Sequence, residues 1–314
     1  MTQVTNVTVS FNAVGNREDL SDMIYNVDPT DTPIVTAVKS SKATAVLHEW
    51  QTDTLDAASG TNQVQEGATV AATAFTATVR ESNTCEIAQK AFAVSGTQMA
   101  VRPAGRKDEL AYQALKATKA LRRDIEKSLF GVNTAETTNA NTTARKAGAF
   151  ETWITSNVSR AGDGASGSRG NSTATDGTQR AFDESLVKQV LALAWDNGGD
   201  PDCIFLGSFN KQVYSGFAGN ATRFKTAEDR TLVATIDVYQ SDFGEIRVYP
   251  SRWSRSRTAL LIQKEFVGVA WLRPVHQVEL AKTGDAELRE VIGEYTLEVL
   301  NEKAHGVVAD LTTS

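Results

Sequence analysis

The sequence contains very little cysteine and histidine. Cys85 and Cys203 are the only cysteines among 314 residues, they form no Cys-x-x-Cys pattern, and only three histidines accompany them. Two isolated cysteines cannot build a structural zinc cluster or a disulfide framework. These counts argue against a metalloprotein and against a disulfide-rich secreted domain, and they favour a soluble protein made in a reducing compartment.

Long hydrophobic runs are missing as well. The best candidate, residues 259–271, is interrupted by Lys264 and Glu265, so it falls short of the roughly 18 apolar residues that a membrane-spanning helix needs. The opening residues 1–10 have neither the basic nor the apolar part of a secretory signal. We therefore expect neither a membrane segment nor a secretory leader.

Positive charge is in the minority. The chain has 32 Lys and Arg against 38 Asp and Glu, which gives a net charge of −6 and an isoelectric point of about 5.3. This balance argues against a protein that holds nucleic acid across a broad face, although a local basic patch is compatible with it. A hydrophobic fraction of 41% is enough to bury a core, and 314 residues predict two domains or one large domain with insertions.

The sequence matches known catalytic and cofactor-binding motifs only in part. Residues 162–167 match G-x-G-x-x-G, but they lie in a Gly/Ser-rich stretch without a following helix, which predicts a loop. His48 begins an H-E-x-x-H zinc motif, yet Thr52 stands where the second histidine is needed. A Ser–His–Asp hydrolase would lack the G-x-S-x-G nucleophile turn. The sequence therefore predicts no catalytic residue, no cofactor and no metal site.

The chain does contain extended elements beside one compact region. Residues 44–80 predict an extended hairpin, whose middle part, 53–70, has too few large apolar side chains to form a core. Apolar residues recur mainly every fourth position from 103 to 130, which predicts a helix roughly 40 Å long. From residue 182 onward, short apolar strands and helices predict a compact α/β region. A monomeric enzyme gains little from extended appendages, whereas a subunit that clasps its neighbours needs them.

The densest basic segment lies at residues 252–257. It contains Arg252, Arg255 and Arg257 around a single tryptophan. Cations beside an aromatic ring can hold a nucleic-acid backbone and stack on a base, which predicts a DNA-facing basic patch. The segment fits an ordinary charged hairpin tip between two strands better, and both interpretations stay open.

Short motifs across nearly the whole chain, about residues 17–311, resemble those of one family. They read REDLSDMIYN (17–26), DPTDTP (28–33), HEWQTDTL (48–55), VSGTQ (94–98), AGRKDELAY (104–112), NGGDPD (197–202), GSFNKQ (207–212), AKTGD (281–285) and NEKA (301–304). In these motifs the sequence is similar to the major capsid proteins of tailed double-stranded DNA bacteriophages, which use the Hong Kong 97-type shell fold.

The resemblance implies an α+β, Hong Kong 97-like capsid fold. Its parts would be an N-terminal arm at 1–43, an extended loop (a β-hairpin) at 44–83, a peripheral domain at 84–180 and 276–314 with a spine helix at 103–130, and an axial domain at 181–275. Arm and loop then supply the candidate inter-subunit contacts, which are Arg17, Leu20, Met23, His48, Trp50, Glu66 and Phe75.

The function implied by the resemblance is self-assembly. Hexamers and pentamers of this chain would form the icosahedral shell around packaged double-stranded DNA, assembled in the cytoplasm of a bacterial host and retained in the virion. Portal, scaffolding and decoration proteins are implied partners, contact with DNA would be non-specific, and the early position of the arm predicts a separate scaffold or none. An encapsulin-like compartment shell, which encloses enzymes, is the alternative, and a hydrolase is the third hypothesis.

Overall fold

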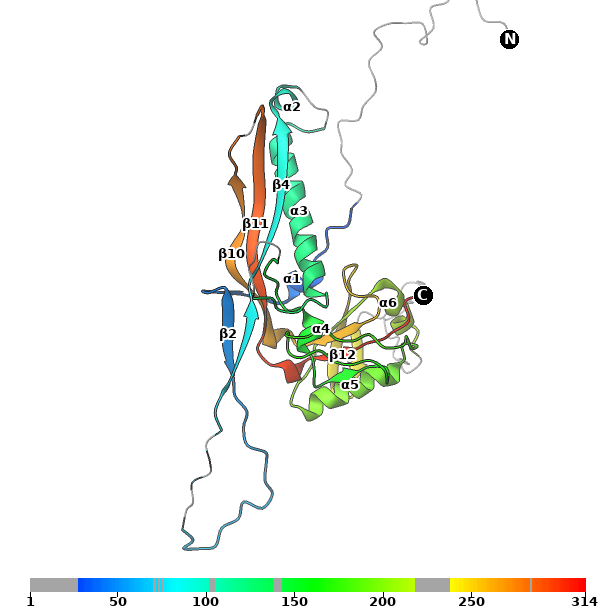
Figure 1. Ribbon diagram of the computed structural model, residues 1–314. Coiled ribbons are helices and arrows are strands. Elements are labelled where there is room, and N and C mark those ends of the chain that lie inside the picture. Colours follow the sequence, from blue (N-terminus) through cyan, green and yellow to red (C-terminus); the bar gives the residue numbers. More distant parts are fainter. Residues whose placement is uncertain are drawn as a thin grey trace, which may run out of the picture.

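Two β-sheets, a hairpin and a long helix organise the molecule (Figure 1). The structure is a computed structural model, which describes residues 28–69, 72, 74, 76–101, 105–137, 143–217, 238–282 and 284–314. Four of the predicted contact residues lie outside these described residues, namely Arg17, Leu20, Met23 and Phe75. No helix in the described ranges is long and apolar enough to cross a membrane.

The four-stranded sheet forms the elongated half of the molecule. Its strands lie in the order β1 (Lys39–Lys42), β10 (Val267–Glu279), β11 (Ala286–Val299) and β4 (Glu86–Ser95). β1 runs parallel to β10, whereas β10, β11 and β4 pair antiparallel. Exposure alternates along β4 because successive side chains of a strand point to opposite faces of the sheet.

α3 (Glu109–Leu129) lies along this sheet, as its apolar stripe predicts (Figure 1). Leu121, Ile125 and Leu129 follow one another every fourth residue and are all buried. Residues at this spacing share one face of a helix, so a single stripe attaches the helix to the sheet.

The start of α3 is fixed by Asp108, whose side chain serves as the N-cap. Its carboxylate accepts hydrogen bonds from the backbone N–H groups of Leu110 (2.8 Å) and Ala111 (3.2 Å). These groups have no partner within the helix, so a carboxylate in this position stabilises the first turn. Residues 105–108 are not helical, and the predicted start at residue 103 is therefore wrong.

Asp108→Ala should lower the free energy of unfolding by about 1 kcal/mol, the usual cost of losing a helix cap. Urea denaturation followed by circular dichroism measures this loss. The matched control is Lys107→Ala, an exposed side chain outside the helix, which should change stability by less than about 0.5 kcal/mol. Equal losses in the two variants would contradict the capping role of Asp108.

The six-stranded sheet forms the compact half. Its order is β5 (Val158–Ser159), β12 (Gly306–Val308), β9 (Ala259–Ile262), β6 (Cys203–Leu206), β8 (Gly244–Pro250) and β7 (Val238–Ser241). The helices of this half are α5 (Glu184–Asp196) and α6 (Ser208–Ser215). The strand at 203–206 and a helix capped by Asp183 confirm the predicted compact α/β region.

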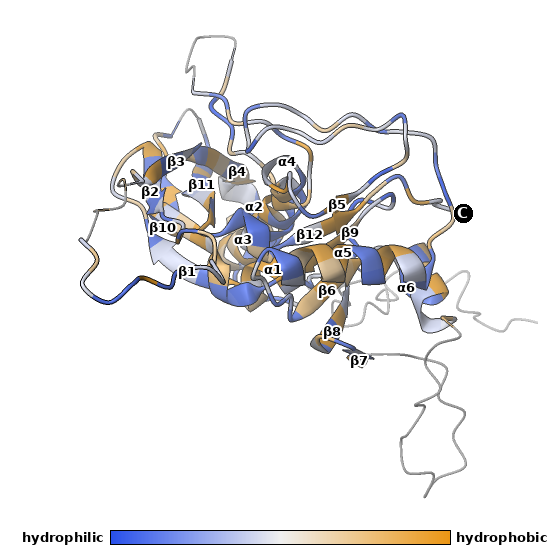
Figure 2. Ribbon diagram, turned by 90° about the horizontal axis from the view of Figure 1, so that it is seen from below, coloured by the Kyte–Doolittle hydropathy of each residue, from blue (hydrophilic) through white to orange (hydrophobic). Residues whose placement is uncertain are grey.

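Hydrophobic cores lie on both faces of the six-stranded sheet. Along β6, Phe205 belongs to the core shared with α3 and the four-stranded sheet, whereas Ile204 and Leu206 belong to the core beneath α5 and α6. A strand covered on both faces is apolar throughout, and Figure 2 shows β6 and β9 in orange. The first core joins both sheets into one body.

The sheets shift the predicted domain borders. β10 runs without a break across the predicted border between residues 275 and 276 and belongs entirely to the four-stranded sheet. β5 and β12, predicted within the peripheral domain, belong instead to the six-stranded sheet. Each sheet is completed by strands from distant parts of the chain, which local periodicity does not reveal.

The predicted arm, residues 1–43, also ends within the body. α1 (Pro33–Ala37) buries Ile34, and β1 is hydrogen-bonded to β10. Residues 33–42 are thus part of the folded core rather than an appendage. The remaining short helices are α2 (Gly96–Ala100), α4 (Phe150–Trp153) and the 3-10 helices η1 (Lys264–Phe266) and η2 (Glu302–Ala304).

Candidate functional site

The extended loop leaves the body through a two-stranded hairpin. β2 (Leu47–Thr52) pairs antiparallel with β3 (Val79–Thr84), which confirms the hairpin but extends it beyond the predicted end at residue 80. The chain between the strands projects away from both sheets in Figure 1. Leu55 is 98% exposed, Val64 is 83% exposed, and Glu66 is exposed beside them. The segment therefore has no core of its own, and its exposed apolar side chains are typical of an interaction surface.

The base of the hairpin is firmly packed. The ring of Trp50 is 8% exposed and lies 5.3 Å from the ring of Trp153 and 5.8 Å from that of His48, measured between centroids. Trp50 fills the core beneath the hairpin and leaves little of its side chain open to a neighbouring subunit. His48 Nε2 lies 3.4 Å from Glu298 Oε1, which holds this side chain against its own chain.

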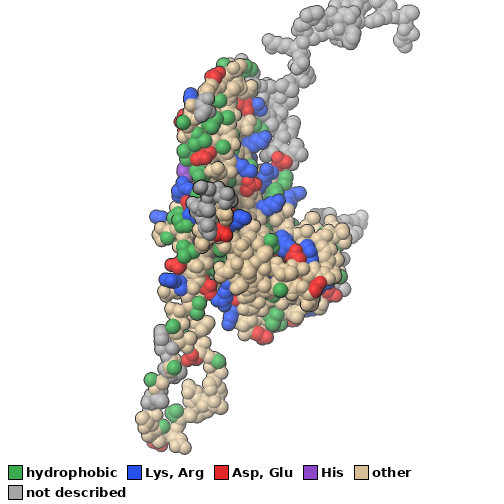
Figure 3. Space-filling view, in the orientation of Figure 1, with side chains coloured by type: hydrophobic (Ala, Val, Ile, Leu, Met, Phe, Trp, Pro, Cys, Tyr) green, Lys and Arg blue, Asp and Glu red, His purple; other side chains and the backbone are tan. Residues whose placement is uncertain are grey.

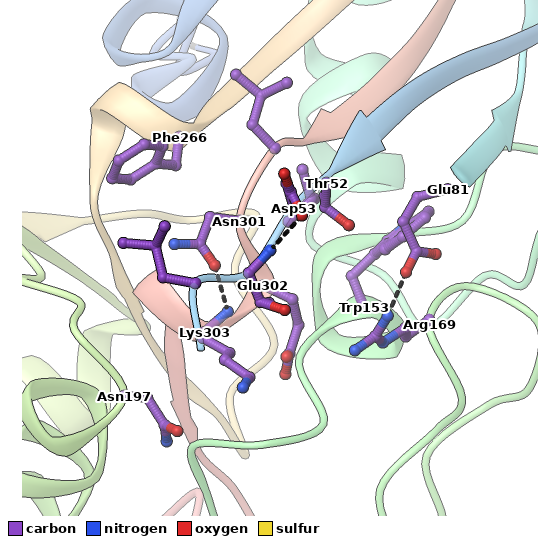
Figure 4. A pocket seen from close by; sticks show the side chains of 14 residues that line it. Thr52, Asp53, Glu81, Trp153, Arg169, Asn197, Phe266, Asn301, Glu302 and Lys303 are labelled. Atoms are coloured by element: carbon purple, nitrogen blue, oxygen red, sulfur yellow. Dashed lines mark hydrogen bonds and ion pairs between the residues drawn. The ribbon is translucent and has the colours of Figure 1, made fainter. Parts of the chain in front are cut away.

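A hollow of about 590 Å³ lies beside this base (Figure 4). Residues 52–55 of the loop bound it on one side, and residues 299–303 bound it on the other. An ion pair between Glu81 and Arg169 lies beside Trp153 on a further wall. No histidine or cysteine lines the hollow, which lies where the loop departs from the hairpin.

Glu302 ties the segment after α4 to the C-terminal part of the chain. Its carboxylate accepts the N–H groups of Thr155 and Ser156, both at 2.6 Å, and the Ser156 hydroxyl at 2.8 Å. Asn157 Nδ2 donates to the carbonyl of His305 at 2.8 Å. Sequence analysis missed this site, because the partners are about 147 residues apart and only the fold brings them together.

The root of the N-terminal arm is held by a buried carboxylate on α3. Glu126 Oε1 accepts the N–H of Ile34 at 2.7 Å, and Oε2 accepts the N–H of Val35 at 2.9 Å. Burial raises the pKa of Glu126 to about 7, while the two backbone hydrogen bonds oppose this shift. Glu126 is followed by the buried Leu129 and Phe130 but preceded at the same spacing by Arg122 and Arg123, so no apolar row indicated its burial.

A second anchor holds the residues just before α1. Trp253 Nε1 donates to the carbonyl of Asp31 at 2.8 Å, and the Arg123 guanidinium lies 5.7 Å from the Trp253 ring centroid. Arg123 also donates to the carbonyl of Pro29 at 3.5 Å. The tryptophan of the basic segment therefore helps to fix the arm root.

The predicted DNA-facing basic patch is largely neutralised within the chain. Arg255 lies 2.6 Å from Glu151 and 2.7 Å from Asp176, and Arg257 lies 3.5 Å from both Asp176 and Asp310. These carboxylates come from distant segments, so the sequence did not show that the two arginines are paired. The prediction is not supported for Arg255 and Arg257, and only Arg252 is exposed.

Reactive groups are scarce in the described part of the chain. Cys85 and Cys203 are free and buried, and desolvation raises the pKa of Cys85 to about 11 and that of Cys203 above its ordinary value. A neutral thiol is a poor nucleophile and a poor metal ligand. Among the described residues, no group of three or more His, Cys, Asp or Glu side chains could hold a metal ion.

A projecting loop on a rigid base is typical of a structural building block. The sequence model of the SU10 major capsid protein family matches residues 3–312. The chain belongs to this family, and its function is that of a phage major capsid protein, a structural part of the virion and not an enzyme.

Individual relatives agree with this assignment. The major capsid protein of Escherichia phage Phieco32 is 24% identical, and the match covers 96% of each chain. A capsid chain of cyanophage A-1(L) superposes with a TM-score of 0.68 at 13% identity, covering 99% of this chain and 100% of the other. These likenesses confirm the predicted Hong Kong 97-like fold.

The encapsulin alternative also has a structural neighbour. The encapsulin SrpI of Synechococcus elongatus superposes with a TM-score of 0.55 at 11% identity, covering 95% of this chain and 93% of the other. Such a likeness shows a common fold alone. Membership of the capsid family therefore favours a phage shell over an enzyme compartment.

Proposed function

We propose that copies of this chain assemble into the hexamers and pentamers of an icosahedral shell around double-stranded DNA. The part of the extended loop beyond the hairpin strands, residues 53–78, would reach the neighbouring subunits together with the N-terminal arm. The observation that carries this proposal is the loop itself, which projects from a rigid hairpin and leaves Leu55 and Val64 uncovered. A neighbouring molecule would bury these side chains.

The anchors described above suit such a role. Trp50 holds the base of the loop, and Glu126 with Trp253 holds the root of the arm, so both appendages start from fixed positions. Each subunit then needs contacts of only moderate strength, because closed symmetry repeats them and a multivalent subunit dissociates only when all of them break.

Other partners follow from membership of the capsid family. Portal, scaffolding and decoration proteins are the partners that we propose, together with non-specific contact between the shell and the packaged DNA. Assembly would take place in the cytoplasm of the bacterial host. Of the predicted contact residues, Glu66 on the loop and His48 at its base stay candidates among the described residues.

Replacing residues 53–78 by Asn-Gly tests the role of the loop. Thr52 and Val79 are paired across the hairpin, and Asn-Gly forms the two-residue turn that such a pair accepts. We expect the variant to keep the circular dichroism spectrum of the folded body but to form no shells in electron microscopy. Ser59→Ala, a small change at an exposed loop position, is the control and should assemble normally.

Two outcomes would count against the proposal. Normal shells from the loopless variant would remove the loop from the subunit contacts. A full-length protein that stays monomeric at high concentration in every buffer would overturn assembly itself.

A further inference from the structure

Three cations form a row on the exposed face of α3. Lys116, Lys119 and Arg122 are spaced three residues apart, and all three are exposed. Residues at this spacing are neighbours on a helix surface, and the row extends over roughly 9 Å at 1.5 Å per residue. Within the part of the chain that the structure describes, none of the three has an ion-pair partner. Figure 3 shows Lys and Arg side chains along this side of the elongated half.

The row ends at a second hollow of about 590 Å³, bounded by α1, β1, α3 and β10. Arg122 lines it from the helix, and Lys42 and Ser40 line it from β1. No carboxylate lines this hollow. Ser41 on its wall donates at 2.7 Å to Glu298, which His48 also approaches, so this neighbouring carboxylate is already engaged. The hollow therefore carries uncompensated positive charge.

Cations elsewhere in the molecule are mostly compensated. Arg160 and Arg255 share the carboxylate of Glu151, and Lys90 lies 2.7 Å from Asp124 on the flank of α3. The whole chain has a net charge of −6. The row of unpaired cations and the carboxylate-free hollow at its end therefore form a positively charged surface on a protein whose net charge is negative.

We infer that the cationic surface formed by Lys42, Lys116, Lys119 and Arg122 contacts the phosphates of the enclosed duplex DNA. The inference rests on the proposed function, because a filled shell supplies a polyanion at high local concentration. Arginine binds a phosphate through two parallel N–H groups, and lysines add point charges whose attraction does not depend on base sequence. α3 then faces the interior of the shell.

The chemistry of the hollow favours phosphates over bases. Its one aromatic side chain, Trp271, packs against Tyr295 at 5.7 Å between ring centroids and is only partly exposed. Stacking on unpaired bases needs an open aromatic face, which this surface does not present. Double-stranded DNA without sequence preference is therefore the occupant that the surface fits.

Binding of a fluorescent 30-base-pair duplex to the full-length protein tests the inference, measured by anisotropy over a range of salt concentrations. The test variant combines Lys42→Gln, Lys119→Gln and Arg122→Gln. The matched control removes the same charge at three other exposed cations with no ion-pair partner in the described residues, by Lys146→Gln, Arg247→Gln and Lys303→Gln. Electron microscopy of each protein monitors shell formation separately.

We expect the test variant to bind on the order of 100-fold more weakly at 0.1 M salt, because each lost phosphate contact removes about 0.9 from the slope of log K against log salt concentration. The control should keep most of the affinity and the slope. Equal losses in both variants, or no DNA binding by the wild type, would overturn the inference.

Two further outcomes separate the competing occupants. DNA binding that appears only after deletion of residues 1–27 would assign the surface to the chain's own arm, and tighter binding of poly-L-glutamate than of DNA at equal charge would assign it to an acidic protein. Either result would overturn the inference. Failure of the wild type to form shells would instead overturn the proposed function and leave the DNA measurement valid.

Discussion

Glu151→Gln should destabilise the protein by about 3–5 kcal/mol, the cost of breaking a buried ion pair by removing one partner. Glu151 is 1% exposed and accepts hydrogen bonds from Arg160 at 3.1 Å and from Arg255 at 2.6 Å. The side chain of Arg160 is itself 5% exposed. The neutral amide keeps the size of the carboxylate but leaves Arg160 without a counter-charge and Arg255 with Asp176 alone, in a site that water reaches poorly.

The matched control for this prediction is Asp176→Asn. Asp176 is the other carboxylate on Arg255, at 2.7 Å, but its side chain is 36% exposed. Water compensates an exposed charge, so we expect a loss of less than about 1 kcal/mol. Chemical denaturation of both variants at neutral pH measures the difference. Similar losses would show that burial of Glu151 does not determine the stability of this junction.

The same junction shows why the sequence left two interpretations of the basic segment open. A run of arginines has the same composition whether it faces solvent or meets carboxylates. Arg255 meets Glu151 across 104 residues of sequence, and periodicity carries no information about such pairs. Sequence reasoning could locate the cations but not their partners, and the partners decide which cations are free to bind DNA.

Elements whose signal is local were predicted well. The apolar stripe of α3 and the continuous apolar run of β6 each specify their burial within a few residues. The burial of Trp50 was not predicted, because β2 is half polar and its pattern does not show which face is covered. Glu126 and Glu302 were missed for the reason that applied to Arg255, since their partners lie far away in the chain.

Two buried titratable groups should have opposite effects on stability as pH changes. Burial raises the pKa of Glu126 from 4.5 to about 7, and burial lowers the pKa of His305 from 6.5 to about 4. The N–H of Gln263 donates to His305 Nδ1 at 3.2 Å, which suits the neutral ring, while the carboxylates of Glu302 and Asp202 oppose the shift of His305. The neutral form of each group is favoured in the folded state.

The signs follow from proton binding in the folded and unfolded chains. Between pH 4.5 and about 7 the folded protein holds the proton of Glu126 that the unfolded chain has lost, so stability falls as pH rises. Between about pH 4 and 6.5 the unfolded chain protonates His305 while the folded protein does not, so stability rises with pH. At about 1.4 kcal/mol per pKa unit, each effect amounts to about 3 kcal/mol.

Because the two windows overlap from pH 4.5 to 6.5, the effects should nearly cancel in the wild type, and single variants should expose them. Relative to the wild type, Glu126→Gln should gain about 3 kcal/mol of stability as pH rises from 4.5 to 7, because it lacks the opposing carboxyl. His305→Gln should lose about the same amount as pH rises from 4 to 6.5. Denaturation curves at half-unit pH steps measure both differences.

The double variant Glu126→Gln with His305→Gln is the decisive control, since its stability should follow that of the wild type at a constant offset across the shared window. Independent sites add in this way when they share no partner. A single variant whose curve stays parallel to that of the wild type would show that its group keeps an ordinary pKa in the fold. Protonation of Glu126 also concerns the root of the N-terminal arm. The carboxylate that titrates near neutral pH is the one that accepts the N–H groups of Ile34 and Val35.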